Sequence, residues 1–324
     1  MKDDTYRENV VWLFLMRILE SSYCFFNRRS YINNVLVDEV RKEAKAIEPI
    51  RKTDSDASNE WIRYSNWIRN LVANKNPAFF LRWRPIRETM NVTNSRFILE
   101  ELNYLRETTD WNSFWKNFIR ENHIGGQIPS IFYPLSSGNN IHHSYVLKNF
   151  LEKTNHDLKN TKFIFEYGGG YGNLCRLIYK AGFNGKYILY DIPIISRLQK
   201  FYLKSCKLPV YDKDDIFDRK DGIFCIDSLD DLANILEKEV TQNKEKNLFI
   251  ASWSISESPL NVRKEVHEVL FRFGYFLIGY QNKFGEVDNK KYFSQFKTKA
   301  SGIIWYDLPL KHLPAHNLLI GKMI

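Results

Sequence analysis

A short turn of the chain holds four glycines within five positions, namely Gly168, Gly169, Gly170 and Gly172. The turn follows the apolar run Lys162–Tyr167 and precedes a helix-like segment. Because glycine has no Cβ, its backbone reaches positive φ and lets a ligand approach closely, while the next helix offers free N–H groups. No Lys followed by Ser or Thr comes directly after the last glycine, as it does in a phosphate-binding P-loop. The glycines therefore predict a site for a ligand other than a nucleoside triphosphate.

Two acids accompany the glycine turn. Glu166 lies two residues before the first glycine, and Asp191 ends the next apolar run, nineteen residues past Gly172. A carboxylate beside the turn repels a pyrophosphate but attracts the sulfonium and ammonium groups of S-adenosylmethionine. Asp191 can accept hydrogen bonds from both ribose hydroxyls of either kind of nucleoside cofactor. The spacing Gly170-x-Gly172-x-x-Cys175 is a degraded dinucleotide fingerprint, so Glu166 is the residue that favours the sulfonium cofactor.

Strand-like and helix-like segments alternate in the second half of the chain. The strand-like runs are Lys162–Tyr167, Lys186–Asp191, Gly222–Asp227, Asn247–Trp253 and Tyr275–Tyr280. Such alternation predicts a parallel sheet with helices on both faces. The runs Gly302–Pro309 and Asn317–Ile324 have no helix between them, so they predict an antiparallel pair at the end of the sheet.

The first 125 residues predict helices instead. Apolar residues recur at steps of three and four in Tyr6–Phe26, Tyr31–Ala46, Asn59–Ala73, Ser95–Arg106 and Asn112–Arg120. The stretch His123–Asn140 is rich in Gly, Pro, Ser and Asn and is the expected boundary. We therefore expect a helical N-terminal region over residues 1–125, with a role in substrate binding or oligomer formation, and a second domain over residues 126–324.

Composition limits the class of protein. With 44% hydrophobic and 15% aromatic residues, the chain of 324 residues is too apolar for a disordered protein. No apolar run reaches the ~18 residues of a membrane span. The four cysteines are scattered, which is typical of reduced thiols, and the N-terminus does not resemble an export signal. These features predict a cytoplasmic protein without a membrane span.

The charge of the chain has two interpretations. A net charge of +9 favours an anionic partner, but an excess of this size also arises without functional meaning. The densest basic cluster is Lys75–Glu88, where Arg82, Arg84 and Arg87 alternate with aromatic residues. Arginines can hold phosphate groups in pairs of hydrogen bonds, whereas an amphipathic segment that docks its rings produces the same pattern. Docking is the favoured interpretation of this cluster, and phosphate binding is the alternative.

Three motifs carry a resemblance to a known family. They are FEYGGGYGNL at Phe165–Leu174, YILYDIP at Tyr187–Pro193 and FIASWSISESP at Phe249–Pro259. They resemble class I S-adenosylmethionine-dependent methyltransferases, specifically bacterial sugar O-methyltransferases, and the resemblance runs from about Tyr133 to the C-terminus. It implies an α/β fold with a Rossmann-like, seven-stranded methyltransferase sheet. That sheet would be parallel with a C-terminal antiparallel hairpin, and a mainly helical region would precede it.

The resemblance also implies a set of cofactor contacts. The methionine portion would lie against the residues of the turn, namely Glu166, Tyr167, Gly168, Gly170 and Gly172. The nucleoside and the sulfonium would contact residues at the ends of the next three strands, namely Asp191, Ile192, Asp227, Ser228, Ser252 and Trp253. Among these, Asp191 would bind the ribose and Ile192 the adenine ring, and Trp253 would form the floor beneath the sulfonium.

Methyl transfer to a sugar hydroxyl needs a group that takes the hydroxyl proton. Glu257 follows the fourth strand by one short turn and is the first candidate for this base. Its alternative role is to cap the helix that starts near Asn261. His142 and His143 lie on an expected loop before the sheet and are further candidates. Histidines on a loop are as often surface residues or pocket-lining residues.

A bound metal is another way to activate the hydroxyl. Asp288 and Asn289 follow the fifth strand and, with Glu257, would offer three oxygen ligands to a hard cation. Asp-Asn also favours a plain turn, which is the interpretation we adopt, so no metal is expected. His312 and His316 have helical metal-ligand spacing, but a proline between them opposes a helix.

The leading expectation is an O-methyltransferase that uses S-adenosylmethionine to methylate a sugar hydroxyl of a surface-glycan precursor, either nucleotide-linked or lipid-linked. Tyr133, Arg82 and Arg84 are the expected acceptor contacts, and phosphates on such a precursor would give the arginines a ligand. An RNA acceptor is one alternative, although the sequence contains no recognised RNA-binding module. A binding protein in glycan assembly, without turnover, is the other alternative. A homo-oligomer is compatible with each.

Overall fold

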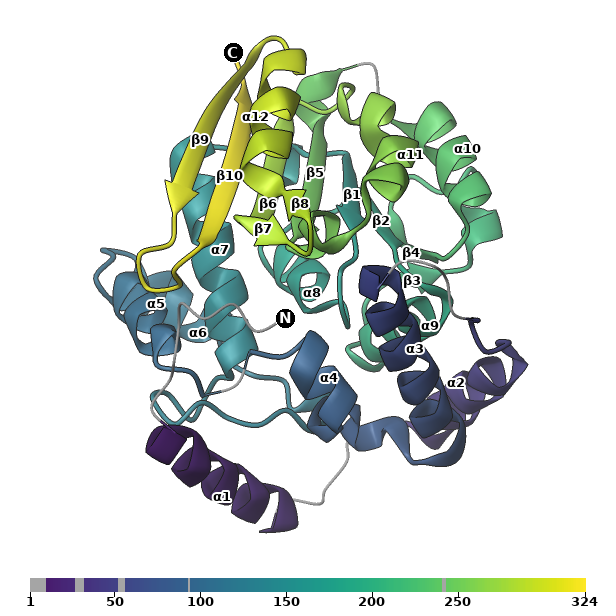
Figure 1. The fold of residues 1–324 in the computed structure, drawn as a ribbon, viewed down its shortest axis with the longest axis vertical. Coiled ribbons are helices and arrows are strands. Elements are labelled where there is room, and N and C mark those ends of the chain that lie inside the picture. The colour runs from purple at the N-terminus through teal and green to yellow at the C-terminus, as the bar shows by residue number, and fades with distance from the viewer. Residues whose placement is uncertain (1–9, 27–31, 52–55, 93, 241–242) are drawn as a thin grey trace.

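The computed structural model describes residues 10–26, 32–51, 56–92, 94–240 and 243–324. A large twisted sheet runs through the molecule, and helices lie on both of its faces (Figure 1). The strand order is β3-β4-β2-β1-β5-β6-β10-β9. The bounds of the strands, in the same order, are β3 (Val210–Tyr211), β4 (Gly222–Ile226), β2 (Lys186–Tyr190), β1 (Phe163–Tyr167), β5 (Asn247–Ser252), β6 (Tyr275–Gln281), β10 (His316–Met323) and β9 (Ile303–Pro309).

The direction of each strand follows from its connection. Across the sheet, the neighbouring strands β4, β2, β1, β5 and β6 pair in parallel, as helical crossovers require. All five residues of β1 are buried, which is typical of a strand covered on both faces. β10 runs antiparallel to β6 and to β9. The predicted parallel sheet with its antiparallel C-terminal hairpin is confirmed, and the two-residue strand β3 adds an eighth strand at one edge.

Helices cover both faces of the sheet. On one face lie α10 (Leu229–Glu239), α11 (Leu260–Leu270) and α12 (Asn289–Lys299). On the other face lie α7 (Gly138–Thr154), α8 (Asn173–Lys180) and α9 (Pro193–Ser205). Side chains alternate between the faces along a strand, so Glu166 of β1 lies on the α8 side with Ile164. A small hairpin of β7 (Lys283–Phe284) and β8 (Val287–Asp288) follows β6.

The N-terminal region is helical, as the apolar periodicity predicts. Its longer helices are α1 (Val10–Phe26), α2 (Asn34–Ala46), α3 (Asp56–Asn74) and α5 (Phe97–Arg106). Residues 6–9 of the first predicted helix and residue 31 of the second lie outside the described residues. The predicted helix Asn112–Arg120 is instead a π-helical turn, Trp111–Trp115, followed by α6 (Lys116–Phe118), where three aromatic rings pack together. Between α3 and α5 lie a 3₁₀ helix (Pro77–Arg82) and α4 (Arg84–Thr89).

Helix α7 begins within the stretch predicted to be an irregular boundary. Ser137 caps this helix, because its hydroxyl accepts a hydrogen bond from the Asn140 N–H at 3.2 Å. The polar residues after the cap are buried and hydrogen-bonded; the Asn139 amide, for example, donates to a main-chain carbonyl of the helical region. The expectation that His142 and His143 lie on a loop is therefore wrong, and both residues lie on α7.

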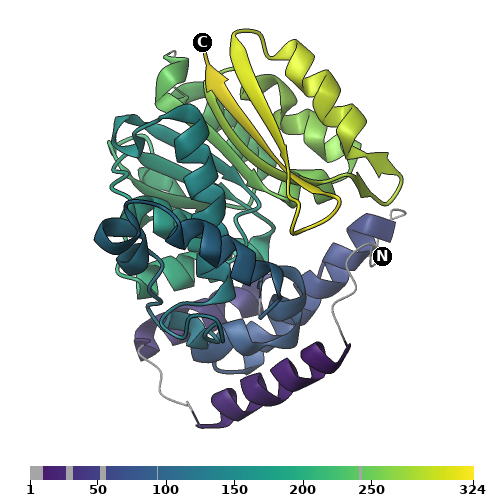
Figure 2. The same ribbon diagram turned by 90° about the vertical axis from the view of Figure 1, so that its left-hand side faces the viewer.

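One hydrophobic core joins the helical region to the sheet. Buried residues from Val37 of α2 to Ile320 of β10 form a continuous cluster under α7, α8 and α9. Figure 2 shows the N-terminal helices gathered at one end of the sheet, with α1 lying farthest from it. Within the described part of the chain, no helix has the length and apolar character needed to cross a bilayer.

Candidate active site

A cavity of about 590 Å³ opens at the carboxyl ends of β1, β2 and β5. One wall comes from the sheet, and a second set of lining residues comes from the helical region, including Trp61 of α3 and Phe97 of α5. Parallel sheets bind ligands at this edge, beside the point where the strand order reverses, which here lies between β1 and β5. The volume is within the range of pockets that hold small molecules and cofactors.

Most of the predicted cofactor residues line this cavity. From β1 and its turn they are Glu166, Tyr167, Gly168 and Gly170. From the segments that follow β2 and end β5 they are Asp191, Ile192, Ser252 and Trp253. The sheet brings these segments together because β1 lies between β2 and β5.

Gly168 packs the turn against the segment that follows β5. Its φ is +67°, and a Cβ at this position would lie 2.3 Å from the Cβ of Ser254. Any larger residue would therefore push the two segments apart. The Ser254 hydroxyl donates a hydrogen bond to the Tyr167 carbonyl, which joins the same segments. The backbone of the turn thus lines the cavity in a conformation that glycine adopts without strain.

Glu166 lies beneath the turn with its side chain buried. The Tyr187 hydroxyl donates a hydrogen bond to its carboxyl group at 2.6 Å. Burial raises the pKa of Glu166 to about 7, and the hydrogen bond from Tyr187 opposes part of this rise. A positively charged ligand nearby would stabilise the ionised form of this carboxyl group.

Asp191 is tied to the glycine turn. Its carboxyl group accepts hydrogen bonds from the Ile192 N–H at 2.9 Å and from the Gln199 side-chain amide at 3.0 Å. The same amide donates to the Gly170 carbonyl at 2.9 Å. Burial raises the pKa of Asp191 to about 7; the Ile192 N–H opposes this rise, and the charge of Glu166 adds to it. The two acids therefore influence each other across the turn.

Trp253 lines the cavity. It follows β5 with φ +66°, a conformation that is uncommon outside glycine. Its indole N–H donates a hydrogen bond to Nδ1 of His316 at 2.7 Å. The ring covers Gly279, where a Cβ would lie 2.7 Å from a ring carbon. Gly279 therefore leaves the space that the Trp253 ring occupies.

Glu257 ends the short helix Ser254–Glu257 and lines the cavity. Burial raises the pKa of Glu257 to about 7, and a hydrogen bond with Gln281 opposes part of this rise. The N-cap position of α11 is Pro259, so the interpretation of Glu257 as the cap of this helix is wrong. The carboxyl group is instead available to the cavity.

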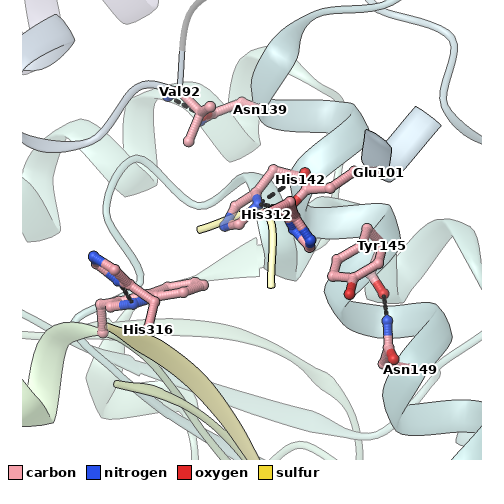
Figure 3. A network of polar contacts seen from close by, with 9 residues as sticks. Val92, Glu101, Asn139, His142, Tyr145, Asn149, His312 and His316 are labelled. Carbon is pink, nitrogen blue, oxygen red and sulfur yellow. Dashed lines mark hydrogen bonds and ion pairs between the residues drawn. The ribbon is translucent and has the colours of Figure 1, made fainter. Parts of the chain in front are cut away.

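Two histidines share one buried carboxylate, that of Glu101 (Figure 3). Nδ1 of His142 lies 2.8 and 3.0 Å from the two carboxylate oxygens, and Nε2 of His312 lies 3.0 Å from one of them. Burial by itself would raise the pKa of Glu101, but the charges and hydrogen bonds of the histidines outweigh burial and hold the pKa below its usual range. His142 lines the cavity, with its ring centroid 5.1 Å from that of Trp253.

Glu101 is absent from the site residues predicted from the sequence. A usable signal is nevertheless present, because Glu101 falls on the apolar stripe of α5, four residues from both Phe97 and Leu105. An acid on such a stripe has to be paired once it is buried. His312, considered only as a metal ligand in the sequence, is one of its two partners.

His143 also lines the cavity, but its environment differs from that of His142. Its Nδ1 lies 3.0 Å from the side-chain nitrogen of Asn173. Burial lowers the pKa of His143 to about 3, and the charges of His142 and Arg176 act in the same direction. The His143 ring is therefore neutral across the physiological pH range.

Three of the predicted cofactor residues lie outside the cavity lining. Gly172 packs against α9, where a Cβ would lie 3.1 Å from a leucine side chain. Asp227 forms an ion pair with Arg197 at 2.9 Å. Ser228 caps α10 by accepting a hydrogen bond from the Asp231 N–H at 3.3 Å. Each of the three has a structural partner.

The predicted acceptor residues also lie outside the cavity lining. Arg82 donates hydrogen bonds to two main-chain carbonyls, at 2.8 and 3.2 Å. Arg84 forms an exposed ion pair with Glu88 at 2.7 Å, and Arg87 pairs with a glutamate of α1. The ring of Tyr133 packs against a tryptophan of the helical region. These contacts fit the interpretation of the basic cluster as a docking segment.

The loop after β6 supplies structural contacts. Asp288 caps α12 by accepting a hydrogen bond from the Lys291 N–H at 3.0 Å. The Asn289 amide donates to the carbonyls of Ser256 and Gln281 at 3.1 and 2.9 Å. Among the described residues, no group of three or more His, Cys, Asp or Glu is placed to hold a metal ion.

Comparison with known proteins gives similarities to solved structures. The methyltransferase domain of bacterial CtHen1-CN is 16% identical with a TM-score of 0.40, and the match covers 57% of this chain and 99% of that chain. A TehB-like S-adenosylmethionine-dependent methyltransferase from Corynebacterium glutamicum is 12% identical with a TM-score of 0.36, covering 69% of this chain and 98% of that chain. MtNAS, solved in complex with MTA and tNA, is 11% identical with a TM-score of 0.38, covering 98% and 100%.

Neither a protein-family model nor a curated protein matches the chain. The matched structures include S-adenosylmethionine-dependent methyltransferases at low identity, and their likeness to this chain concerns the fold alone. The function has to be inferred from the cavity and its residues.

Proposed function

We propose that this chain is an S-adenosylmethionine-dependent O-methyltransferase that methylates a hydroxyl group of a sugar. The observation that carries the proposal is the glycine turn with two acids, the buried Glu166 and the partly buried Asp191, at the edge of the cavity. Among the described residues, no lysine or arginine lines this cavity. Such a site favours a positively charged cofactor and opposes the diphosphate of a dinucleotide.

The residues of the cavity fit this cofactor. The turn Gly168–Gly170 leaves its backbone open to the methionine portion, and Glu166 beneath it balances positive charge. Asp191 would accept the ribose hydroxyls, Ile192 would lie against the adenine ring, and Trp253 would lie beneath the sulfonium. The cofactor supplies an activated methyl group when bound. The chain itself therefore has to orient the acceptor hydroxyl, exclude water and take the hydroxyl proton.

The wall from the helical region suits an uncharged sugar ring. Trp61 offers an aromatic face, while Ser65 and Asn91 offer hydrogen-bonding groups. Because no lysine or arginine of the described residues lines the cavity, the phosphates of a nucleotide-linked or lipid-linked sugar would lie outside it. For the expected surface-glycan precursor, we propose that the sugar enters the cavity and the phosphate-bearing carrier stays at the mouth.

The two alternatives are an RNA acceptor and a binding role without turnover. RNA binding depends strongly on phosphate contacts, and the described lining offers no lysine or arginine for them. A binding protein needs no proton acceptor, whereas His142 and Glu257 both line the cavity. These observations favour methyl transfer to a sugar over both alternatives.

Isothermal titration calorimetry tests the cofactor. We expect the protein to bind S-adenosylmethionine and S-adenosylhomocysteine and not NAD. Asp191→Asn should weaken binding by about tenfold, because the ribose loses hydrogen bonds to a charged acceptor. The exposed Asp218→Asn is the matched control and should bind normally. Binding of NAD without binding of the sulfonium compound would overturn the proposal.

Turnover tests the acceptor. The protein is incubated with S-adenosylmethionine and a panel of free sugars, nucleotide sugars, lipid-linked sugars and RNA, and release of S-adenosylhomocysteine is measured. We expect release with sugar acceptors. Release that depends on RNA and is lost at raised salt would support the RNA alternative. Cofactor binding without release on any acceptor would support a binding role.

A further inference from the structure

Glu101 is an acid in a place where sequence periodicity predicts an apolar residue. It lies on the inner stripe of α5 and has no solvent-exposed surface. A buried carboxylate is costly unless hydrogen-bond donors and opposite charge compensate it. His142 of α7 and His312, between β9 and β10, supply this compensation (Figure 3). Three separate elements thus meet at one carboxylate.

The shared carboxylate fixes where each histidine carries its proton. An ionised carboxylate only accepts hydrogen bonds, so Nδ1 of His142 and Nε2 of His312 both carry the N–H that points to Glu101. When the His142 ring is neutral, its Nε2 therefore has a free lone pair. Nε2 is then ready to accept a proton.

The cavity selects His142 rather than His312. His142 lines the cavity, whereas His312 is outside its lining. Since Nδ1 of His142 is turned to Glu101, the edge of the ring that carries Nε2 is the one left to face the cavity. The ring centroids of His142 and Trp253 lie 5.1 Å apart. Trp253 follows β5 and precedes Ser254, the residue that packs against Gly168 of the glycine turn. Nε2 is therefore near the place where the methyl group would be presented.

We propose that His142 is the general base of the reaction and that Glu101 and His312 are its positioning residues; this inference rests on the proposed methyltransferase function. Nε2 of His142 takes the proton of the acceptor hydroxyl while its oxygen forms a bond to the methyl carbon. The carbon–sulfur bond breaks, its electron pair stays on sulfur, and neutral S-adenosylhomocysteine leaves. The positive charge lost by the sulfonium thus appears on His142, where the carboxylate of Glu101 stabilises it.

His312 has a supporting role in this arrangement. Its Nε2–H donates to Oε1 of Glu101, the oxygen that Nδ1 of His142 also contacts, so this second donor helps to hold the carboxylate in place beside His142. The ring of Phe97, one turn earlier on α5, packs edge-on against His142 with centroids 5.9 Å apart and limits the tilt of that ring. The orientation of His142 is therefore set by contacts on two sides.

The other two candidates are less well arranged. His143 has its Nδ1 beside Asn173, and burial lowers the pKa of His143 to about 3, which makes the ring a weak base. Burial raises the pKa of Glu257 to about 7, so Glu257 is a competent base by strength alone. Glu257 forms a hydrogen bond with the neutral side chain of Gln281, whereas His142 is paired with a carboxylate that fixes the proton on one chosen atom, and experiment can separate the two residues.

Nuclear magnetic resonance tests the tautomer without any acceptor. The protein is labelled with ¹⁵N-histidine, saturated with S-adenosylhomocysteine and measured at a pH at which the rings are neutral. The signals are assigned with His142→Gln and His312→Gln. We expect His142 to be protonated on Nδ1 and His312 on Nε2. In Glu101→Gln the new amide can donate to Nδ1, so the His142 proton should move to Nε2. A native His142 protonated on Nε2 would overturn the proposal.

Kinetics on the sugar acceptor test the role of the ring. His142→Gln and Glu101→Gln should lower the turnover rate by about 10²–10⁴-fold, while calorimetry gives unchanged cofactor affinity. Glu101→Asp should recover part of the rate, because it restores the charge. His267→Gln, on α11 and outside the cavity lining, is the matched control and should turn over normally. A large loss with Glu257→Gln and none with His142→Gln would overturn the assignment.

Different results would overturn the methyltransferase function and the assignment of His142 as the base. Absence of S-adenosylmethionine binding would overturn the proposed function itself. Normal cofactor binding and normal sugar methylation by His142→Gln would overturn only the assignment of the base.

Discussion

At the scale of single residues, the acids Glu166 and Asp191 make cofactor binding depend on pH. Burial raises the pKa of each to about 7, so each is partly protonated near neutral pH in the free protein. A bound sulfonium favours the ionised forms. We expect the affinity for S-adenosylmethionine to rise between pH 6 and pH 8 by up to about tenfold for each acid that has to be ionised, as measured by calorimetry.

S-adenosylhomocysteine is the matched control for this prediction, because it lacks the sulfonium charge and should gain less affinity over the same range. The stability of the free protein should change in the opposite direction. The folded pKa values lie above the ordinary values of 4.5 and 3.8, so the acids contribute stability that is fully present below about pH 4 and is lost as the pH rises through about 7. An equal gain in affinity for both ligands would contradict the electrostatic account.

Gly168 gives a second prediction at this scale. A Cβ there would collide with Ser254 at 2.3 Å, so Gly168→Ala should lower the free energy of unfolding by about 2–4 kcal/mol and abolish cofactor binding. Gly285 is the matched control, since it has φ +55° and a Cβ at this position would have no atom within 4 Å. Gly285→Ala should cost only roughly 1–2 kcal/mol and leave binding intact. Urea unfolding and calorimetry measure both quantities; equal losses in the two variants would rule out the steric explanation.

At the scale of secondary-structure elements, variants of Asp288 test whether this residue caps a helix or binds a metal ion. It accepts a hydrogen bond from the Lys291 N–H at the start of α12. Asp288→Ala should therefore lower the free energy of unfolding by about 1 kcal/mol, whereas Asp288→Asn should keep it, because asparagine caps helices equally well. Methylation by both variants should be unchanged by a chelator. A loss of activity in Asp288→Asn that added magnesium restores would instead indicate a metal site.

At the scale of the whole molecule, the helical region and the sheet share one core, so they should unfold together. Buried side chains of α2, α3 and α5 belong to the same cluster as those of β1 and α9, and Lys204 of α9 pairs with Glu39 of α2 at 3.0 Å. We expect one calorimetric transition with equal calorimetric and van't Hoff enthalpies. Two separate transitions would show that residues 1–125 and 126–324 unfold independently.

Much of the fold is predictable because most strands and helices carry their own signals. Short apolar runs predict β1, β2, β5 and β6, and the absence of a helix between the last two runs predicts the C-terminal hairpin. Helix α12 escapes prediction because its sequence is mostly polar and only Asn289, Phe293 and Phe296 are buried. The start of α7 is not predicted either, because its residues are polar although they are buried. Asn139, Asn140 and Ser144 have the composition of an exposed loop.

The sequence by itself determined the glycine edge of the site. Glu166, Gly168 and Asp191 belong to one strand–turn–helix–strand unit, and local geometry places such residues at the carboxyl edge of a sheet. Only the tertiary structure decided that Glu101 meets His142 and His312, which are 41 and 211 positions away along the chain. The physical reason is that a buried carboxylate takes whichever donors the packing of distant elements brings to it, and no local pattern encodes that choice.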